Sequence, residues 1–213
     1  MPGTKYRPVG IPMRDETGYL EPQQIEQLIK SADNLRDKML LYTLTRTGRR
    51  ISEVVGSKPD ANGLIKSPGL RPIDINPDEN QITFVVLKAK KARLGRSIIP
   101  KTLTDKLLSY INYYHIAPNS RLFPISRERA WQIVRKTSIR AGLKGIGNPP
   151  MPIRPHHLRH SFAINFARNC QNPKDITELK QALGHTNINA TIWYIEKFNM
   201  VERAKIIESM FGD

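Results

Sequence analysis

Apolar residues recur every three or four positions along most of this chain, which is the spacing of helices that bury one face. The first such stretch carries Ile25, Leu28 and Ile29, and Pro22 before them is suited to a first helical turn. A second apolar stretch covers residues 39–44. Helices are also predicted over residues 50–55, 102–114, 127–141, 156–168, 173–183, 188–197 and 201–210.

Three shorter stretches are rich in β-branched and aromatic residues and predict strands at residues 73–75, 81–87 and 96–100. Residues 1–18 hold three prolines and three glycines among mixed charges, which indicates an extended arm or linker. The remainder, residues 19–213, is expected to form one domain. The predicted fold is therefore mainly α-helical with a small antiparallel β-sheet, an α+β arrangement.

The balance of charge narrows the class of partner. The chain of 213 residues contains 34 lysines and arginines against 19 aspartates and glutamates, a formal net charge of +15. So large an excess predicts attraction to a polyanion, and nucleic acid is the candidate partner. Composition alone does not say which nucleic acid, because ribosomal and other RNA-binding proteins share this balance.

The number of cysteines and the length of the apolar runs indicate in which cellular compartment the protein is expected. Cys170 has no second cysteine with which to form an intramolecular disulfide or a zinc site, and it is expected to be a small buried apolar residue. No run of about 18 apolar residues occurs, so no membrane partner is predicted. An intracellular protein, cytoplasmic and associated with the nucleoid, is expected.

The first of two arginine motifs lies in the N-terminal third of the chain. Residues 47–53 read Thr-Gly-Arg-Arg-Ile-Ser-Glu and place Arg50 in a first helical turn, with Glu53 three residues later. A guanidinium binds phosphate oxygens with a planar fork and stays charged at neutral pH, so Arg50 is a candidate phosphate ligand. The plainer alternative is a surface ion pair between Arg50 and Glu53.

The second arginine motif places a histidine one helical turn before the arginine. Residues 155–163 read Pro-His-His-Leu-Arg-His-Ser-Phe-Ala, so His156 and Arg159 can face the same phosphate, and imidazole suits proton transfer near neutral pH. His156 and His160 also have the i, i+4 spacing of a metal site. Such a site needs a glutamate within the motif and a further ligand, and neither is present, so no metal is predicted.

A histidine and a tyrosine near the C-terminus complete a recognisable order. Leu183, Gly184 and His185 are followed nine residues after the histidine by Tyr194. Alone, such a histidine is an ordinary surface residue and such a tyrosine a packing residue. The joint order and spacing of the arginines, histidines and tyrosine resemble the active site of the tyrosine recombinases, the phage integrase family. Arg49 departs from that pattern, because the family usually carries an apolar residue there; its side chain could contact the DNA backbone or reach solvent.

The resemblance implies a covalent mechanism. Tyr194 would attack the scissile phosphate to form a 3′-phosphotyrosyl link while a 5′ hydroxyl departs. No cofactor is expected, because the covalent ester stores the energy of the broken bond. The resemblance assigns the other catalytic roles to Arg50, Arg159 and His185 as phosphate ligands, His156 as proton acceptor, Glu53 as the residue that orients Arg50 or His156, and Lys88 as proton donor.

Residues 88–96, between two predicted strands, hold five cations and no acid. This composition alone predicts a patch that contacts phosphates. In the family a lysine of this hairpin protonates the departing hydroxyl, and Lys88 is the candidate because it directly follows the strand, with Lys90 and Lys91 as alternatives. The predicted DNA-binding residues are Lys90, Lys91, Arg93, Arg96, Arg49 and His160.

The function that the resemblance implies is site-specific recombination or integration of double-stranded DNA, by a homo-oligomer that forms a tetramer on paired sites. The resemblance covers the catalytic domain, and the usual N-terminal core-binding domain is expected to be absent. Two alternatives remain open. One is DNA relaxation like that of a type IB topoisomerase, which acts as a monomer without paired sites. The other is a noncatalytic DNA-binding protein, for which the tyrosine is unnecessary.

Overall fold

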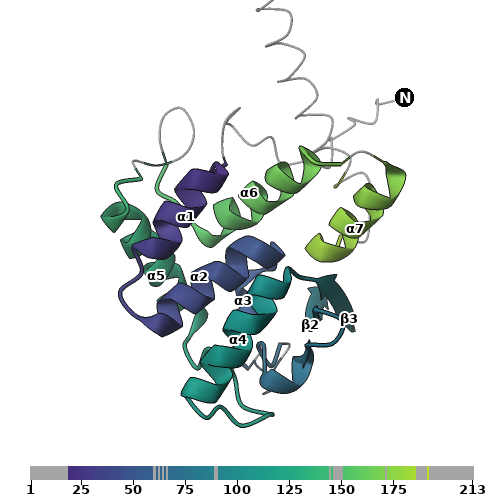
Figure 1. Ribbon diagram of the computed structural model, residues 1–213. Helices are drawn as coiled ribbons and strands as arrows, with labels where there is room; N and C mark the ends of the chain where they lie inside the picture. The colour runs from purple at the N-terminus through teal and green to yellow at the C-terminus, as the bar shows by residue number, and fades with distance from the viewer. Residues whose placement is uncertain are drawn as a thin grey trace, which may run out of the picture.

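A central helix, α2, is surrounded by other helices, and a three-stranded sheet lies at one edge of the molecule (Figure 1). The computed structural model describes residues 19–59, 61, 63, 65, 67–88, 91–143, 145, 151–170, 172–185 and 191. In chain order the elements are α1 (Pro22–Lys30), α2 (Leu35–Thr47), α3 (Ile51–Val55), the 3-10 helix η1 (Pro72–Asp74), β1 (Ile75–Asn76), β2 (Gln81–Lys88), β3 (Lys91–Ile98), α4 (Lys101–Tyr113), α5 (Arg127–Arg140), α6 (Pro155–Ala167) and α7 (Pro173–Leu183).

Local sequence sets the ends of the two helices that lead into the site. α2 begins after Asn34, whose side chain accepts a hydrogen bond from the Asp37 amide at 2.9 Å, and it ends at Gly48 with a φ of 61°. α7 ends in the same way at Gly184, with a φ of 62°. Glycine adopts this left-handed conformation without the steric penalty of a Cβ atom. The chain therefore leaves both helices at fixed points, and His185 follows the second of them directly.

The core forms around α2, which packs against α1, α3, α4, α5 and α6. A smaller cluster joins α6 to α7, which lie above α2 in Figure 1. Each fully buried large apolar side chain contributes about 1.5–3 kcal/mol relative to its exposed state. Among the most completely buried are Leu28, Leu40, Leu41, Leu44, Leu103, Leu107, Leu122, Phe123, Val134 and Leu158.

The sheet is antiparallel with the order β1-β2-β3. Gln81 pairs with Ile98 at the base of the β2–β3 hairpin, and Lys88 pairs with Lys91 at its tip. Ile82 and Phe84 are buried, as expected for alternate residues on the inner face of a strand. α3 packs against β2 and α7 packs against β3. The sheet thus touches two of the helices that carry predicted site residues or lead to them.

The mainly α-helical fold with a small antiparallel sheet is confirmed, with two local corrections. A strand over residues 73–75 was wrong in its first part, because Pro72 starts a 3-10 turn in which the Asp74 carboxylate accepts a hydrogen bond from the Arg71 amide at 2.9 Å. The basic stretch 88–96, which was predicted to lie between two strands, is mostly strand itself, since β3 already begins at Lys91. The predicted helices over residues 188–197 and 201–210 and the predicted arm at 1–18 lie outside the described residues, apart from Thr191.

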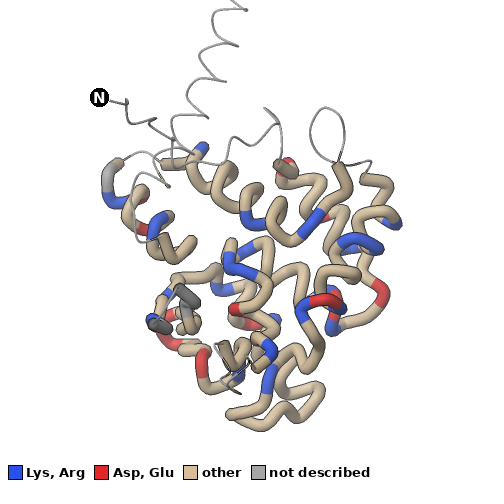
Figure 2. Tube along the Cα trace, turned by 180° about the vertical axis from the view of Figure 1, so that it is seen from behind, with Lys and Arg blue, Asp and Glu red and all other residues tan. Residues whose placement is uncertain are grey.

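Basic residues are spread over the fold rather than confined to one element (Figure 2). In the part of the chain that the structure describes, no helix is long and apolar enough to cross a membrane. Cys170 is half-buried rather than fully buried, and its thiol lies 3.6 Å from the Phe166 carbonyl oxygen.

Candidate active site

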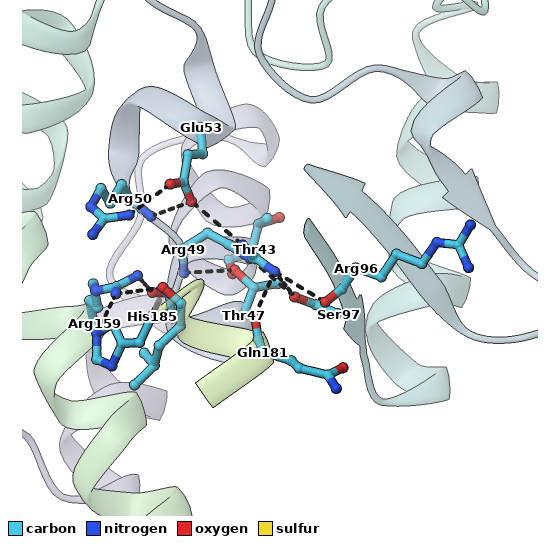
Figure 3. A network of polar contacts seen from close by, with 12 residues as sticks. Thr43, Thr47, Arg49, Arg50, Glu53, Arg96, Ser97, Arg159, Gln181 and His185 are labelled. Atoms are coloured by element: carbon cyan, nitrogen blue, oxygen red, sulfur yellow. Dashed lines mark hydrogen bonds and ion pairs between the residues drawn. The ribbon is translucent and has the colours of Figure 1, made fainter. Parts of the chain in front are cut away.

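Arg50 stands at the start of α3, just before its first helical residue, and is held there by Glu53 (Figure 3). The Arg50 Nη1 atom donates to Glu53 Oε1 at 3.0 Å, and the Arg50 amide donates to Glu53 Oε2 at 3.2 Å. The Glu53 side chain is completely buried, whereas 37% of the Arg50 side chain is exposed. The carboxylate therefore fixes both the backbone and the head group of Arg50 from the interior and leaves part of the guanidinium accessible.

Arg159 lies in the second turn of α6 and joins three segments that are far apart in sequence. Its Nη1 donates to the Gly48 carbonyl oxygen at 2.8 Å, and its Nη2 donates to the Leu183 carbonyl oxygen at 2.6 Å. The same Nη2 lies 3.0 Å from His185 Nε2. Only 5% of Arg159 is exposed. These contacts place the guanidinium at the point where α2 and α7 end.

Both ring nitrogens of His185 have a hydrogen-bond partner, and these contacts fix the orientation of the ring. Arginine has donors only, so His185 Nε2 accepts the bond from Arg159. The other ring nitrogen, Nδ1, therefore carries the proton and donates to Thr191 Oγ1 at 3.0 Å. The His185 ring is thus held from both sides, and Thr191 is fully buried.

His156 lies in the first turn of α6, three residues before Arg159, with an exposed outer edge. Partial desolvation of the imidazole lowers its pKa. The positive charges of Arg159 and Arg50 lower this pKa further. His156 is therefore neutral near neutral pH and can accept a proton.

The structure brings five of the predicted catalytic residues together. Figure 3 shows Arg50, Glu53, Arg159 and His185 within one polar network, and the charges of both arginines act on His156. Tyr194 and Lys90 lie outside the described residues. Lys88 and Lys91 are described as backbone only, at the paired ends of β2 and β3. Arg93 and Arg96 are exposed on β3, and their contact with DNA stays a prediction.

Arg49 and His160 do not suit the DNA contacts predicted for them. Only 1% of Arg49 is exposed, and its guanidinium donates to Ser97 Oγ and to the carbonyl oxygens of Arg96 and Gln181. His160 lies in the buried middle of α6 and is 2% exposed. Neither side chain reaches the surface, so both the solvent and the DNA-backbone alternatives for Arg49 were wrong.

Three contributors to the site, one side chain and two backbone carbonyl groups, were not found from the sequence. Thr191 fixes the His185 ring, and the Gly48 and Leu183 carbonyl oxygens fix Arg159. No motif identifies backbone carbonyl groups, and the six-residue separation of His185 from Thr191 matches no regular spacing. Over the described ranges, no group of three or more histidine, cysteine, aspartate or glutamate side chains is arranged to hold a metal ion.

Comparisons with known proteins match this site and fold. The sequence profile of the Phage integrase family matches residues 74–200. Tyrosine recombinase XerA of Pyrococcus horikoshii is 27% identical over 207 residues, which cover 91% of this chain and 63% of the relative. Tyrosine recombinase XerD of Chlorobaculum tepidum is 33% identical over 169 residues, which cover 75% of this chain and 48% of the relative. This chain thus spans less than two thirds of the length of either relative.

A solved structure supports the fold assignment. The catalytic domain of bacteriophage HP1 integrase superimposes with a TM-score of 0.59 at 24% sequence identity. The superposition covers 91% of this chain and 94% of that domain. The described helices and the small sheet therefore form the same fold as that catalytic domain.

Proposed function

This chain belongs to the phage integrase family, and on that premise we propose that it is a site-specific recombinase that cleaves and rejoins double-stranded DNA. The observation that carries the proposal is the convergence of two guanidinium groups and two imidazoles from three separate segments. Arg159 meets His185 at 3.0 Å and Gly48 at 2.8 Å, while Arg50 follows Gly48 by two residues. A scissile phosphate placed beside these groups would be held by cations on more than one side.

The first chemical step is an in-line displacement at phosphorus. The phenolic oxygen of Tyr194 forms a bond to phosphorus as the bond to the 5′ oxygen breaks, which gives a 3′-phosphotyrosyl ester and a free 5′ hydroxyl. Negative charge grows on the nonbridging oxygens during this step. Arg50 and Arg159 stabilise that charge with hydrogen bonds that are preorganised by Glu53 and by backbone carbonyl groups.

Two proton transfers accompany the displacement. Tyr194 loses its proton to His156, whose lowered pKa keeps the imidazole neutral and ready to accept it. The departing 5′ oxygen gains a proton from a lysine of the β2–β3 hairpin, which we assign to Lys88. Rejoining reverses these steps when a 5′ hydroxyl of another strand attacks the ester. The bond energy is retained throughout, so the reaction consumes neither ATP nor a redox cofactor.

Duplex DNA is the proposed substrate, and a homo-oligomer that becomes a tetramer on paired sites is the proposed assembly. The net charge of +15 supports the first proposal, since counterion release favours binding of a basic surface to DNA. Exchange between two duplexes requires four strand cleavages, and each protomer has one candidate nucleophile. The proposed setting is the cytoplasm, where the chain would act at the nucleoid.

A test must find the target sequence and detect the covalent bond together. Wild-type protein is incubated with a pool of nicked duplexes that carry a randomised core. After cleavage the short fragment beside the nick diffuses away, so religation cannot occur and the covalent adduct accumulates. Denaturing gels report the adduct, and sequencing of the trapped DNA reports the site. We expect an adduct that leaves a 5′ hydroxyl end, which polynucleotide kinase labels without prior phosphatase treatment.

Tyr194→Phe is the matched control, because it removes one hydroxyl and leaves the phosphate contacts in place. It should bind DNA like the wild type and form no adduct. An adduct from Tyr194→Phe would remove this tyrosine from the proposed role. DNA binding by the wild type without any adduct would favour a noncatalytic DNA-binding protein. Relaxation of supercoiled DNA without exchange between recovered sites would favour topoisomerase-like activity.

A further inference from the structure

The guanidinium of Arg49 is buried where three elements meet, and the proposed reaction gives it no role. The side chain is completely inaccessible to solvent. It lies between the segment that links α2 to α3, the strand β3 and the last turn of α7 (Figure 3). Arginine is the largest of the fully buried side chains among the described residues. Burial of a charged group costs free energy unless other interactions compensate, so the position of Arg49 requires a physical explanation.

Four donor–acceptor contacts attach this one group to two other elements, and the two hydrogens of Nη2 are shared among three of the acceptors. Arg49 Nε and Nη2 donate to Ser97 Oγ at 3.1 and 2.6 Å, and Nη2 also donates to the Arg96 carbonyl oxygen at 3.2 Å. On the other side, Nη2 donates to the Gln181 carbonyl oxygen at 3.1 Å. Ser97 and Arg96 belong to β3, and Gln181 lies in the last turn of α7. The planar fork of the guanidinium therefore fixes direction as well as distance.

The Arg49 guanidinium stays charged at neutral pH in spite of its burial. Burial lowers the pKa of Arg49 to about 10, with the Glu53 carboxylate opposing and the Arg50 charge adding to this effect. The Glu53 Oε2 atom lies 3.9 Å from Arg49 Nη1, and the guanidinium carbon lies 4.8 Å from the centre of the Phe84 ring. Nη1 makes no hydrogen bond to any described residue. A well-packed apolar side chain often stabilises a core as much as a buried charge does, so stability alone does not explain an arginine at this position. The property that an apolar side chain would lack is the set of directional hydrogen bonds.

Arg49 is next in sequence to one proposed catalytic residue, and the two elements to which it is hydrogen-bonded carry or precede others. Arg50 is the next residue after Arg49, and the two arginines share Glu53. β3 forms the hairpin that carries the candidate lysines. The last turn of α7 supplies the Leu183 carbonyl oxygen to Arg159 and leads directly to His185.

We propose that Arg49 is a positioning residue that sets the β2–β3 hairpin and the C-terminal end of α7 relative to Arg50. This inference rests on the proposed function for its effect on cleavage, whereas its effect on the fold can be measured without DNA. Misplacement of a catalytic group by about 1 Å can cost about a hundredfold in rate, so a small shift of either element is enough to matter.

The test compares four variants of the full chain. Arg49→Met keeps the long apolar stem and removes all donors, and Arg49→Lys keeps the charge with a different donor geometry. Ser97→Ala removes only the acceptor of two Arg49 hydrogen bonds. Leu107→Ala, at a fully buried position in α4, is the control for a general loss of stability. All are studied at a temperature at which thermal unfolding shows them to be folded.

The first readout is amide hydrogen exchange without DNA. In Arg49→Met we expect exchange to rise about tenfold or more at β3 residues 95–98 and at residues 181–185, with α4 and α5 unchanged. Ser97→Ala should show part of the effect on β3. Leu107→Ala should not raise exchange selectively at either attachment point. Exchange in Arg49→Met that matches the wild type at both points would overturn the proposal.

The second readout is single-turnover cleavage of the trapped site together with its Kd. Arg49→Met should cleave about tenfold to a hundredfold more slowly with Kd changed by less than about twofold, and Arg49→Lys should recover part of the rate. A double variant with both Arg49→Met and Ser97→Ala should cleave no more slowly than Arg49→Met alone. Wild-type rates in Arg49→Met and Ser97→Ala, or an equal loss in Leu107→Ala, would also overturn the proposal. If the wild type forms no adduct, the proposed function fails, and hydrogen exchange still decides whether Arg49 holds the two elements.

Discussion

Two arginines that serve one proposed reaction occupy different environments. The Arg50 side chain is partly exposed and is fixed by a single buried carboxylate, that of Glu53. Arg159 is buried and satisfies the carbonyl oxygens that end two helices. Removal of Arg50, which has only the phosphate to hold, should lower the rate of cleavage. Removal of Arg159, which also stabilises the fold, should lower both the rate of cleavage and the free energy of unfolding.

Replacing either arginine by alanine should slow cleavage by about a hundredfold or more, as expected when a donor that stabilises the transition state is lost. Arg159→Ala should in addition lower the free energy of unfolding by about 1–3 kcal/mol, because it leaves the Gly48 and Leu183 carbonyl oxygens without this donor. Single-turnover cleavage and thermal unfolding of Arg50→Ala and Arg159→Ala measure the two effects. Near-normal cleavage by both variants would contradict the assignment.

The lowered pKa of His156 should appear in the pH dependence of stability. Below its usual pKa of about 6.5 the unfolded chain binds a proton that the folded chain resists. The contribution of His156 to stability is therefore present above about pH 6.5 and is lost as the pH falls through the lower folded-state pKa.

His156→Gln should remove this part of the pH dependence. The difference in Tm between wild type and variant is measured from about pH 5 to about pH 7.5. It should shift in favour of the wild type as the pH rises. A difference that does not change with pH would show that the folded-state pKa of His156 is not lowered.

At the scale of elements, the end of α2 fixes how closely α6 can approach. Gly48 has a φ of 61°, and a Cβ atom there would overlap Cδ1 of the Phe162 ring on α6. Both the backbone conformation and the contact exclude a side chain. The packing of α6 on this glycine brings Arg159 within hydrogen-bonding distance of the Gly48 carbonyl oxygen.

Gly48→Ala should destabilise the protein by more than the same change at Gly142. Gly142 also has a left-handed φ, 67°, but a Cβ there meets no atom within 4 Å. Gly142→Ala should cost about 1–2 kcal/mol for the conformation alone. Gly48→Ala should cost about 1–3 kcal/mol more, because the Phe162 ring must move. Denaturant unfolding compares the two, and equal losses would show that the contact is relieved easily.

The candidate proton donors are the lysines at positions 88, 90 and 91 of the sequence, and substrate chemistry can identify which of them acts. Lys88→Ala should lose cleavage out of proportion to binding. A 5′-bridging phosphorothioate should restore it, because a sulfur leaving group departs without protonation. If this substrate instead rescues Lys90→Ala or Lys91→Ala and leaves Lys88→Ala inactive, the general acid is one of those lysines.

At the scale of the whole molecule, the dominant property is the net charge of +15. Basic residues occur across the described fold (Figure 2), and the site itself contains several buried or half-buried guanidinium groups. Long-range attraction is therefore expected to bring DNA to the protein, whereas only a few side chains do chemistry.

DNA affinity should fall linearly with salt on logarithmic axes, with a slope of about −0.9 for each phosphate neutralised. Arg93→Ala, at an exposed position of β3, should reduce the magnitude of this slope by about one. Lys101→Ala is the control, since Lys101 is equally basic but forms an ion pair with Asp105 on α4. Equal slopes for wild type and Arg93→Ala would remove Arg93 from the set of DNA contacts.

Much of the fold follows from local pattern. Apolar spacing predicted the helices that became α1, α2, α4, α5, α6 and α7, because burial of one helix face leaves a direct periodic signal. Gly48 and Gly184 end helices for a similarly local reason, because both adopt a left-handed φ that glycine allows. The pattern failed at residues 73–75, where Pro72 and the Asp74 carboxylate favour a 3-10 turn over the strand that the β-branched residues indicate.

The sequence by itself determined the residue types and spacing of the candidate site, because the chemistry of phosphate binding and proton transfer restricts both. The resemblance of these motifs to the active site of the tyrosine recombinases singled out Arg50, Glu53, His156, Arg159 and His185. Only the tertiary structure decided which of two adjacent arginines faces outward. Arg49 and Arg50 are alike as residues, but packing of β3 and α7 against one side of the chain buries the first and leaves the second accessible. The burial of a side chain depends on elements that are distant in sequence, so it cannot be predicted from the residues of a local motif.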